Sequence, residues 1–174
     1  MNALLIGIMS DTHDNLTLTR KAVTLLLEHG SELILHLGDI IAPFTLNVMR
    51  KAGAKRLIAV YGNNCGEKLL LAKVAEKLGY EIYYPPHIVK LEDMKILMIH
   101  GSGTAEETRH FAESLAISGR YNAVLYGHTH TVDNRIFGNT LLLNPGEVCG
   151  YLTGKSTIAL LDTKKRKTEI VEIK

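Results

Sequence analysis

Two histidines, His128 and His130, lie two residues apart in the stretch YGHTH, directly after an apolar run. An imidazole nitrogen can bind a divalent cation or transfer a proton near neutral pH. A single pair of this kind also occurs in loops that have no function. Whether this pair binds a metal therefore depends on partner ligands elsewhere in the chain.

Residues of similar chemistry follow four other apolar runs, each of which is expected to be a strand. In chain order these residues are Asp11 and His13, then Asp39, then Asn63 and Asn64, then His100. The carboxyl ends of strands in open α/β sheets converge on the ligand-binding crevice, so these side chains can meet in space. Imidazole nitrogens, carboxylates and an amide oxygen suit divalent ions such as Mn, Fe, Co, Ni or Zn.

The spacing of His128 and His130 indicates more than one ion. In extended backbone, residues i and i+2 point to the same side, roughly 6.6 Å apart. That separation is wide for one ion but suits two ions about 3.5–4 Å apart. Two divalent ions would bring four positive charges, of which Asp11 and Asp39 neutralise two. The remaining charge matches a bridging hydroxide plus one anionic oxygen of a phosphate ester.

The first half of the chain alternates strands and helices three times. The expected strands are Ala3–Met9, Leu33–Leu37 and Arg56–Val60. The expected helices span Asn15–His29, the segment opened by Pro43 and closed by Gly53, and Glu67–Leu78. This repeat predicts parallel strands with helices packed on their faces.

The second half is rich in strands. They are expected at Ile88–Leu91, Lys95–Ile99, Ala123–Tyr126, Val132–Phe137, Thr140–Leu143, Thr157–Leu161 and Glu169–Ile173. A capping box formed by Thr104 and Glu107 opens one further helix, whose apolar side is expected to carry Thr108, Phe111, Ala112 and Leu115. The whole pattern predicts an α/β fold in which two sheets pack together with helices outside, in a single domain over residues 1–174.

Composition excludes several classes of protein. The chain is 46% hydrophobic and 22% charged with a net charge of +2, which is ordinary for a globular domain. The one basic run, Lys164 to Lys167, is expected in a hairpin turn, so no specific nucleic-acid partner is predicted. No apolar run reaches membrane-spanning length, the first residues lack a basic leader, and two cysteines do not form a disulfide framework. These features favour a cytoplasmic protein without a membrane partner.

The ordered set D-x-H, G-D, G-N, H and G-H-x-H resembles the calcineurin-like metallophosphoesterase superfamily. Within it, the short chain, the SDTH opening and the N-P-G turn at Asn144–Gly146 resemble the small bacterial and archaeal phosphodiesterases. The match runs from Ser10 to Gly146. It implies a four-layer α/β/β/α sandwich of two mixed sheets flanked by helices.

The resemblance also implies a role for each ligand candidate. Asp11, His13 and His130 would bind a first metal, Asn63, His100 and His128 a second, and Asp39 would bridge the two. The implied activity is hydrolysis of a small phosphodiester by a metal-bridging hydroxide. Manganese is the first expectation for the two divalent ions, with nickel, cobalt, zinc or iron as alternatives.

Two positions depart from the family pattern. Asn64 stands where larger phosphatases of the superfamily have a histidine that helps to protonate the leaving group. An asparagine can donate a hydrogen bond to a phosphate oxygen but cannot act as a general acid. We therefore expect a preference for diesters with good leaving groups over unactivated monoesters. Glu147 follows the N-P-G turn, where small residues are usual, and is expected to alter the rim of the site.

Some residues near these motifs have simpler interpretations. Asp14 and Asn15 are expected to cap the first helix. His36 is expected in a buried strand, with a position behind the metal ligands as the alternative, and Cys65 and Cys149 are expected near the cleft without ligating. A non-catalytic metal-binding scaffold of the same fold is the alternative function, although a scaffold would be free to lose ligands. A homo-oligomer formed through a sheet edge remains compatible with the sequence.

Overall fold

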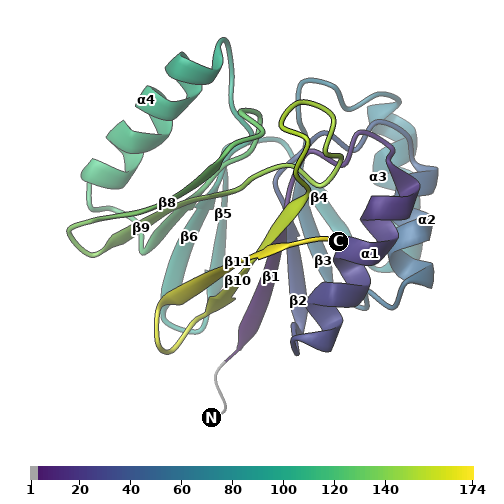
Figure 1. Cartoon of the computed structure of the whole chain (residues 1–174), viewed down its shortest axis with the longest axis horizontal. Helices are drawn as coiled ribbons and strands as arrows, with labels where there is room; N and C mark the ends of the chain where they lie inside the picture. Colours follow the sequence, from purple (N-terminus) through teal and green to yellow (C-terminus); the bar gives the residue numbers. More distant parts are fainter. Residues whose placement is uncertain (1–3) are drawn as a thin grey trace.

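The computed structural model describes residues 4–174, so the predicted start of the first strand at Ala3 lies outside the described residues. Two sheets and four helices make up this part of the chain (Figure 1). The first sheet has the order β11-β10-β1-β2-β3-β4, with β1 Leu5–Met9, β2 Leu33–His36, β3 Leu57–Val60, β4 Glu81–Tyr83, β10 Thr157–Asp162 and β11 Lys167–Glu172. The second has the order β5-β6-β7-β9-β8, with β5 His87–Leu91, β6 Met94–Met98, β7 Ala123–Leu125, β8 Val132–Phe137 and β9 Thr140–Pro145. The helices are α1 Leu16–Glu28, α2 Phe44–Lys51, α3 Lys68–Leu78 and α4 Ala105–Ile117.

Both sheets combine parallel and antiparallel strands. In the first sheet β1 to β4 run parallel, while β10 is antiparallel to β1 and to β11. In the second sheet β6, β7 and β9 run parallel, with β5 and β8 antiparallel at the two edges. Parallel neighbours end at the same edge of a sheet, so the loops after β1, β2 and β3 lie together, as do those after β6 and β7.

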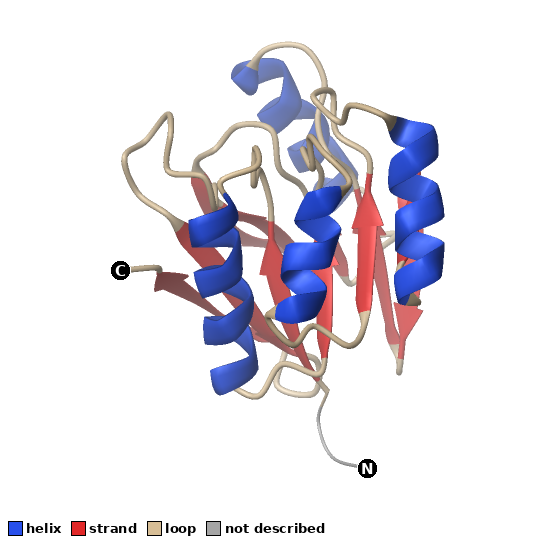
Figure 2. Cartoon of the chain, turned by 90° about the vertical axis from the view of Figure 1, so that its right-hand side faces the viewer, coloured by secondary structure: helices blue, strands red, loops and turns tan. Residues whose placement is uncertain are grey.

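Three apolar cores separate four layers. Helices α1, α2 and α3 cover the outer face of the first sheet, which Figure 2 shows from the helix side; Leu26 and Met49 belong to this core. Ile8 and Met98 belong to the core between the two sheets. Ala112 of α4 lies in the third core, on the outer face of the second sheet. The prediction of a four-layer α/β/β/α sandwich with two mixed sheets is confirmed.

Two details of the fold differ from the sequence-based expectations. Strand β4 was not predicted, because it has only three residues and none of them is buried. Phe111 was expected on the apolar side of α4 but is 55% exposed, so that prediction is wrong. The helix packs through Thr108, Ala112 and Ala116, the first two as predicted, and these small side chains let it lie close to the sheet. The capping box of Thr104 and Glu107 is present as predicted.

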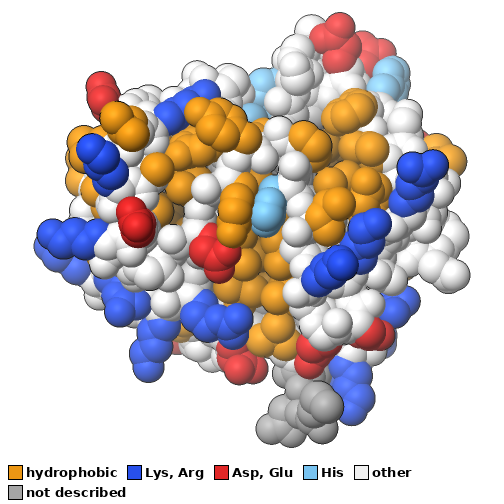
Figure 3. Space-filling model, turned by 180° about the vertical axis from the view of Figure 1, so that it is seen from behind, with side chains coloured by type: hydrophobic (Ala, Val, Ile, Leu, Met, Phe, Trp, Pro, Cys, Tyr) orange, Lys and Arg blue, Asp and Glu red, His pale blue; other side chains and the backbone are white. Residues whose placement is uncertain are grey.

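The surface carries charges of both signs and some exposed apolar side chains. On the face opposite to that of Figure 1, apolar side chains gather between flanking lysines and arginines, with acidic side chains among them (Figure 3). Tyr84 and Ile88, on either side of the turn between β4 and β5, are 68% and 42% exposed. Within residues 4–174, no helix has the length and apolar character needed to cross a membrane.

Candidate metal centre

The structure brings together the seven side chains that the sequence singled out as ligand candidates. They come from the loops that follow β1 (Asp11, His13), β2 (Asp39), β3 (Asn63), β6 (His100) and β7 (His128, His130). Their ligand atoms form two groups that share one carboxylate. The parallel strand order explains this meeting, because all five loops lie at the same end of the two sheets.

The first group consists of Asp11, His13 and His130. Asp11 Oδ1 lies 3.4 Å from His130 Nε2 and 3.8 Å from His13 Nε2. Asp11 Oδ1 and His13 Nε2 are both buried, and neither has a hydrogen-bond partner among the described residues. Buried polar atoms are nearly always paired, so two orphaned ligand atoms that face each other fit the binding of a divalent cation.

The second group consists of Asn63, His100 and His128. Asn63 Oδ1 lies 2.9 Å from His100 Nε2 and 2.8 Å from His128 Nδ1. The other nitrogen of His100, Nδ1, donates to the carbonyl of Leu37 at 2.7 Å and fixes the ring. Three ligand atoms of the types that borderline divalent ions prefer therefore converge on a second point.

Asp39 lies between the two groups and directs one oxygen to each. Its Oδ2 is 3.3 Å from His13 Nε2, and its Oδ1 is 3.4 Å from His100 Nε2. Burial raises the pKa of the Asp39 carboxyl, but His100 and His13 outweigh that effect and hold it well below its ordinary value. In return, Asp11 and Asp39 raise the pKa of His13 to about 9 against the effect of burial. The cluster thus favours positive charge.

The backbone at these positions is unusual. Positive φ angles occur at Asp11 (53°), His13 (40°), Asp39 (60°), His128 (67°) and His130 (58°). This left-handed conformation is uncommon outside glycine and costs on the order of 1 kcal/mol or more at each residue. The expectation that His128 and His130 share an extended segment is therefore wrong. Each nevertheless reaches a different group, since the chain turns sharply between them.

His36 lies behind the ligands and joins two of their loops. Burial lowers the pKa of His36 to about 4, so the ring is neutral. Its Nδ1 accepts from Gly38 N–H at 3.2 Å, which leaves the proton on Nε2, 3.3 Å from Thr12 Oγ1. The Thr12 hydroxyl in turn donates to the Asp39 carbonyl at 3.2 Å. Both predicted settings of His36, a buried strand and a position behind the ligands, hold.

Glu147 was expected at the rim of the site, and that expectation is wrong. Its side chain is fully buried and accepts a hydrogen bond from His130 Nδ1 at 2.6 Å. Burial raises the pKa of the Glu147 carboxyl, but donors that include Cys149 and His130 lower it to about 2. Glu147 is thus an ionised third carboxylate beside the centre. Its departure from the family pattern was the only sequence signal of such a role.

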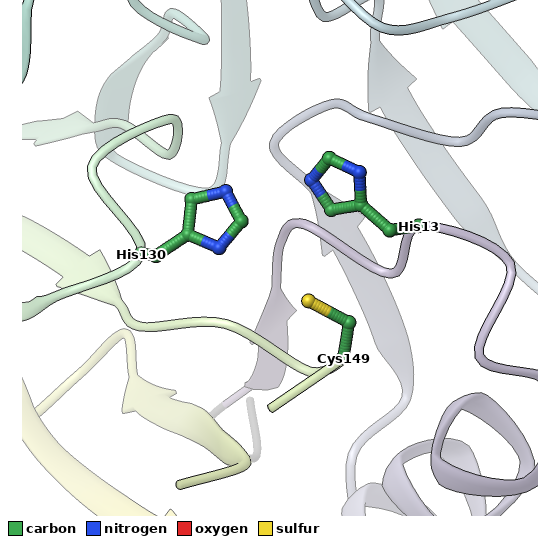
Figure 4. Close-up of side chains that lie close together, drawn as sticks. All are labelled: His13, His130 and Cys149. Carbon is green, nitrogen blue, oxygen red and sulfur yellow. The ribbon is translucent and has the colours of Figure 1, made fainter. Parts of the chain in front are cut away.

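Cys149 lies beside His13 and His130, and the close-up in Figure 4 shows the three side chains together. The thiol donates to Glu147 Oε2 at 3.0 Å. Burial and the neighbouring Glu147 raise the pKa of this thiol to about 12. The predicted place of Cys149 near the cleft is confirmed, and its thiol is a hydrogen-bond donor to Glu147 at a distance from His13 and His130 at which the three could also hold one ion.

The remaining residues near these motifs are placed as follows. Asn15 caps α1 by accepting from Leu18 N–H, as predicted. Asp14 was expected to cap the same helix, but it accepts from Ala42 N–H and the Thr45 hydroxyl at the start of α2. Asn64 donates its side-chain amide to Asp39 Oδ2 at 2.8 Å, so it lies at the centre.

Known proteins resemble this chain in sequence and in fold. The family description "Calcineurin-like phosphoesterase superfamily domain" matches residues 4–166. The chain is 39% identical to phosphodiesterase MJ0936 of Methanocaldococcus jannaschii over 166 residues, 93% of this chain and 95% of that protein. It is 25% identical to phosphodiesterase YfcE of Escherichia coli K12 over 80% of this chain and 76% of that protein. A solved structure of a novel archaeal phosphodiesterase superposes with a TM-score of 0.87 at 36% identity, covering 97% of this chain and 99% of that one. Two groups of ligand-type side chains around a shared aspartate, on this fold and with these relatives, place the chain in the calcineurin-like phosphoesterase superfamily.

Proposed function

We propose that this chain is a phosphodiesterase that depends on two divalent metal ions. The position of Asp39 carries the proposal, because its two oxygens face two separate groups of ligand-type side chains at 3.3 and 3.4 Å. The phosphodiesterases among the relatives support the reaction class. The proposed substrate is a small phosphodiester, and manganese is the first candidate metal, with nickel, cobalt, zinc and iron as alternatives.

Each group of side chains would bind one ion. Asp11, His13 and His130 would supply the first site, and Asp39 would contribute an oxygen to both sites. The second site would be completed by Asn63, His100 and His128. When bound, two divalent ions lower the pKa of a water molecule and offset the negative charge that develops on the phosphoryl oxygens.

The protein's own residues would prepare the site for an anionic ester. Asp11 and Asp39 neutralise only part of the metal charge, so a positive surplus remains to attract a phosphate group. Glu147 adds a further negative charge beside the first group, which makes this surplus smaller than the ligands alone would leave. Asn64, which donates to Asp39, lies close enough to the centre for its amide to reach a phosphate oxygen.

The proposal is tested by metal-stripped protein to which Mn²⁺ is returned. The reconstituted chain should hydrolyse the activated diester bis(p-nitrophenyl) phosphate, and chelation should abolish the reaction. An unactivated monoester such as an alkyl phosphate should react more slowly, because its leaving group needs a proton. A chain that binds Mn²⁺ but hydrolyses neither ester would be a metal-binding scaffold with this fold.

Asn64→His should raise the turnover of an unactivated monoester such as an alkyl phosphate. General acid catalysis contributes about 10²–10⁴-fold in well-aligned sites, and we expect on the order of 10-fold from an unoptimised histidine. Diester turnover should change little, because a good leaving group needs no proton. The measurement is the diester-to-monoester ratio of kcat/KM, with Asn64→Gln as the matched control that adds no titratable ring. An unchanged ratio in the histidine variant would count against the assigned role of this position.

Gly62→Ala should impair hydrolysis through Asp39. A Cβ at Gly62 would overlap the Asp39 carboxylate and backbone nitrogen, so the shared ligand must move. Displacement of a catalytic group by about 1 Å can lower the rate by about 10²-fold, and we expect a loss of that order in kcat when Asp39 moves. Gly119→Ala is the control for destabilisation away from the centre: a Cβ there meets no atom within 4 Å, and the φ of 65° strains the backbone locally. Equal losses in both variants would trace the effect to general destabilisation.

The proposal includes a cytoplasmic location and a small-molecule substrate. Cys65 and Cys149 are both free and buried, which fits the reducing cytoplasm. Lysines and arginines on the face in Figure 3 are interrupted by apolar and acidic side chains, in keeping with a small-molecule substrate in place of nucleic acid.

A further inference from the structure

Glu147 is a fully buried carboxylate whose two oxygens meet only donors. Oε2 accepts from His130 Nδ1 at 2.6 Å and from the Cys149 thiol at 3.0 Å. Oε1 accepts from the backbone N–H of Leu152 at 3.1 Å, and from the N–H and hydroxyl of Thr153 at 2.6 and 2.7 Å. A carboxylate has about four lone-pair sites, so these donors fill its capacity.

From this arrangement we propose that Glu147 is the positioning residue for His130. The other groups that meet the Glu147 oxygens are S–H, N–H and O–H donors, so the geometry points to His130 Nδ1 as a further donor that carries the ring proton. Nε2 is then the free nitrogen, and it is the atom that faces Asp11 Oδ1 at 3.4 Å. Glu147 thereby fixes both the tautomer and the orientation of the ring, with the lone pair directed into the first group.

The same carboxylate connects this histidine to the segment that follows Cys149. Leu152 and Thr153 bind Glu147 through three donor groups, and Leu152 is 74% exposed next to its buried anchor. The segment and the imidazole therefore depend on one side chain. Glu147 itself has no oxygen left for a metal or a substrate, which separates its role from that of Asp11 or Asp39.

The proposal rests on the proposed dinuclear centre and makes a prediction for each ion. Loss of an outer partner of a ligating histidine typically costs about 10–100-fold in metal affinity. We expect a loss in this range for the ion bound by Asp11, His13 and His130. The ion bound by Asn63, His100 and His128 should keep its affinity, because no hydrogen bond joins any of these residues to Glu147 within the described chain.

Glu147→Gln is the direct test, because it keeps the shape and replaces one acceptor oxygen with an NH₂ group. Wherever that group points it faces a donor, and in either orientation His130 loses its charged acceptor and keeps at most a neutral amide oxygen. Thr153→Val is the matched control, since it removes one hydroxyl donor to Glu147 and leaves His130 bonded. Calorimetric titration of the metal-stripped proteins with Mn²⁺ would show weakening of one ion in the glutamine variant and near wild-type affinity in the valine variant.

A second readout uses no metal and no variant. Heteronuclear NMR of the imidazole nitrogens in metal-free wild-type protein, in mildly alkaline buffer, should show His130 protonated at Nδ1. Protonation at Nε2 instead, or two Mn²⁺ ions bound as tightly by Glu147→Gln as by wild type, would overturn the proposal. If His130 of the wild type carries the Nδ1 proton but the protein binds fewer than two ions, the positioning role of Glu147 is supported and the proposal of a dinuclear centre is contradicted.

Discussion

Asp39→Asn should reduce the hydrolysis of an activated phosphodiester by at least about 1,000-fold, equivalent to about 4 kcal/mol of transition-state stabilisation. The substitution removes a carboxylate whose two oxygens face both groups of ligand candidates. Loss of a residue that only hydrogen-bonds to a metal ligand typically costs about 10–100-fold in metal affinity or activity. Loss of a ligand shared by both ions should cost more. The measurement is kcat/KM for bis(p-nitrophenyl) phosphate at saturating Mn²⁺.

A control is needed because Asp39 is buried and its loss also affects folding. Asp162→Asn removes a carboxylate of the β10–β11 turn, where Asp162 accepts from the N–H groups of Lys164 and Lys165. That variant should keep nearly full activity. Thermal unfolding of both variants would show whether each protein is still folded at the temperature of the assay. Comparable kcat/KM in folded Asp39→Asn and wild-type protein would remove the proposed mechanism.

His128→Ala and His130→Ala should each lose one of two bound ions, and not the same one. His128 Nδ1 lies with Asn63 and His100, whereas His130 Nε2 faces Asp11 and the ring of His13 lies 5.0 Å away from its own. We expect each variant to lose activity by about 10²-fold or more, because two-metal hydrolysis needs both ions. Elemental analysis after dialysis would count the ions that remain.

The exposed histidine His110 on α4 provides the control for this pair. His110→Ala should bind the same number of ions as wild type, since its side chain lies outside both groups. Two ions retained in both His128→Ala and His130→Ala would contradict the division into two sites. Loss of the same ion from both variants would mean that the two histidines bind one shared ion.

Much of the fold and the clustering of the site could be predicted from sequence. An apolar run followed by Asp11, Asp39 or His100 predicts both a buried strand and the polar side chain at the end of that strand. Parallel order then requires those ends to meet, so the grouping follows from topology without knowledge of any distance. The capping box of Thr104 and Glu107 was equally readable, because its signal is local.

The remainder depends on contacts between distant parts of the chain. The left-handed backbone at His128 and His130 has no local signal, since these residues are not glycine. Glu147 looked like a rim residue because its donors, His130 and the segment at Leu152–Thr153, reach it only after folding. Strand β4 escaped prediction for a related reason, as three half-exposed residues pair only because β3 lies alongside.

The most direct test of the whole account is the number of metal ions that the metal-stripped wild-type chain takes up. Titration with Mn²⁺, followed by calorimetry and checked by elemental analysis, should reach two ions per chain and restore diester hydrolysis as the second ion binds. Saturation at one ion with full activity, or hydrolysis by protein that holds no metal, would contradict it.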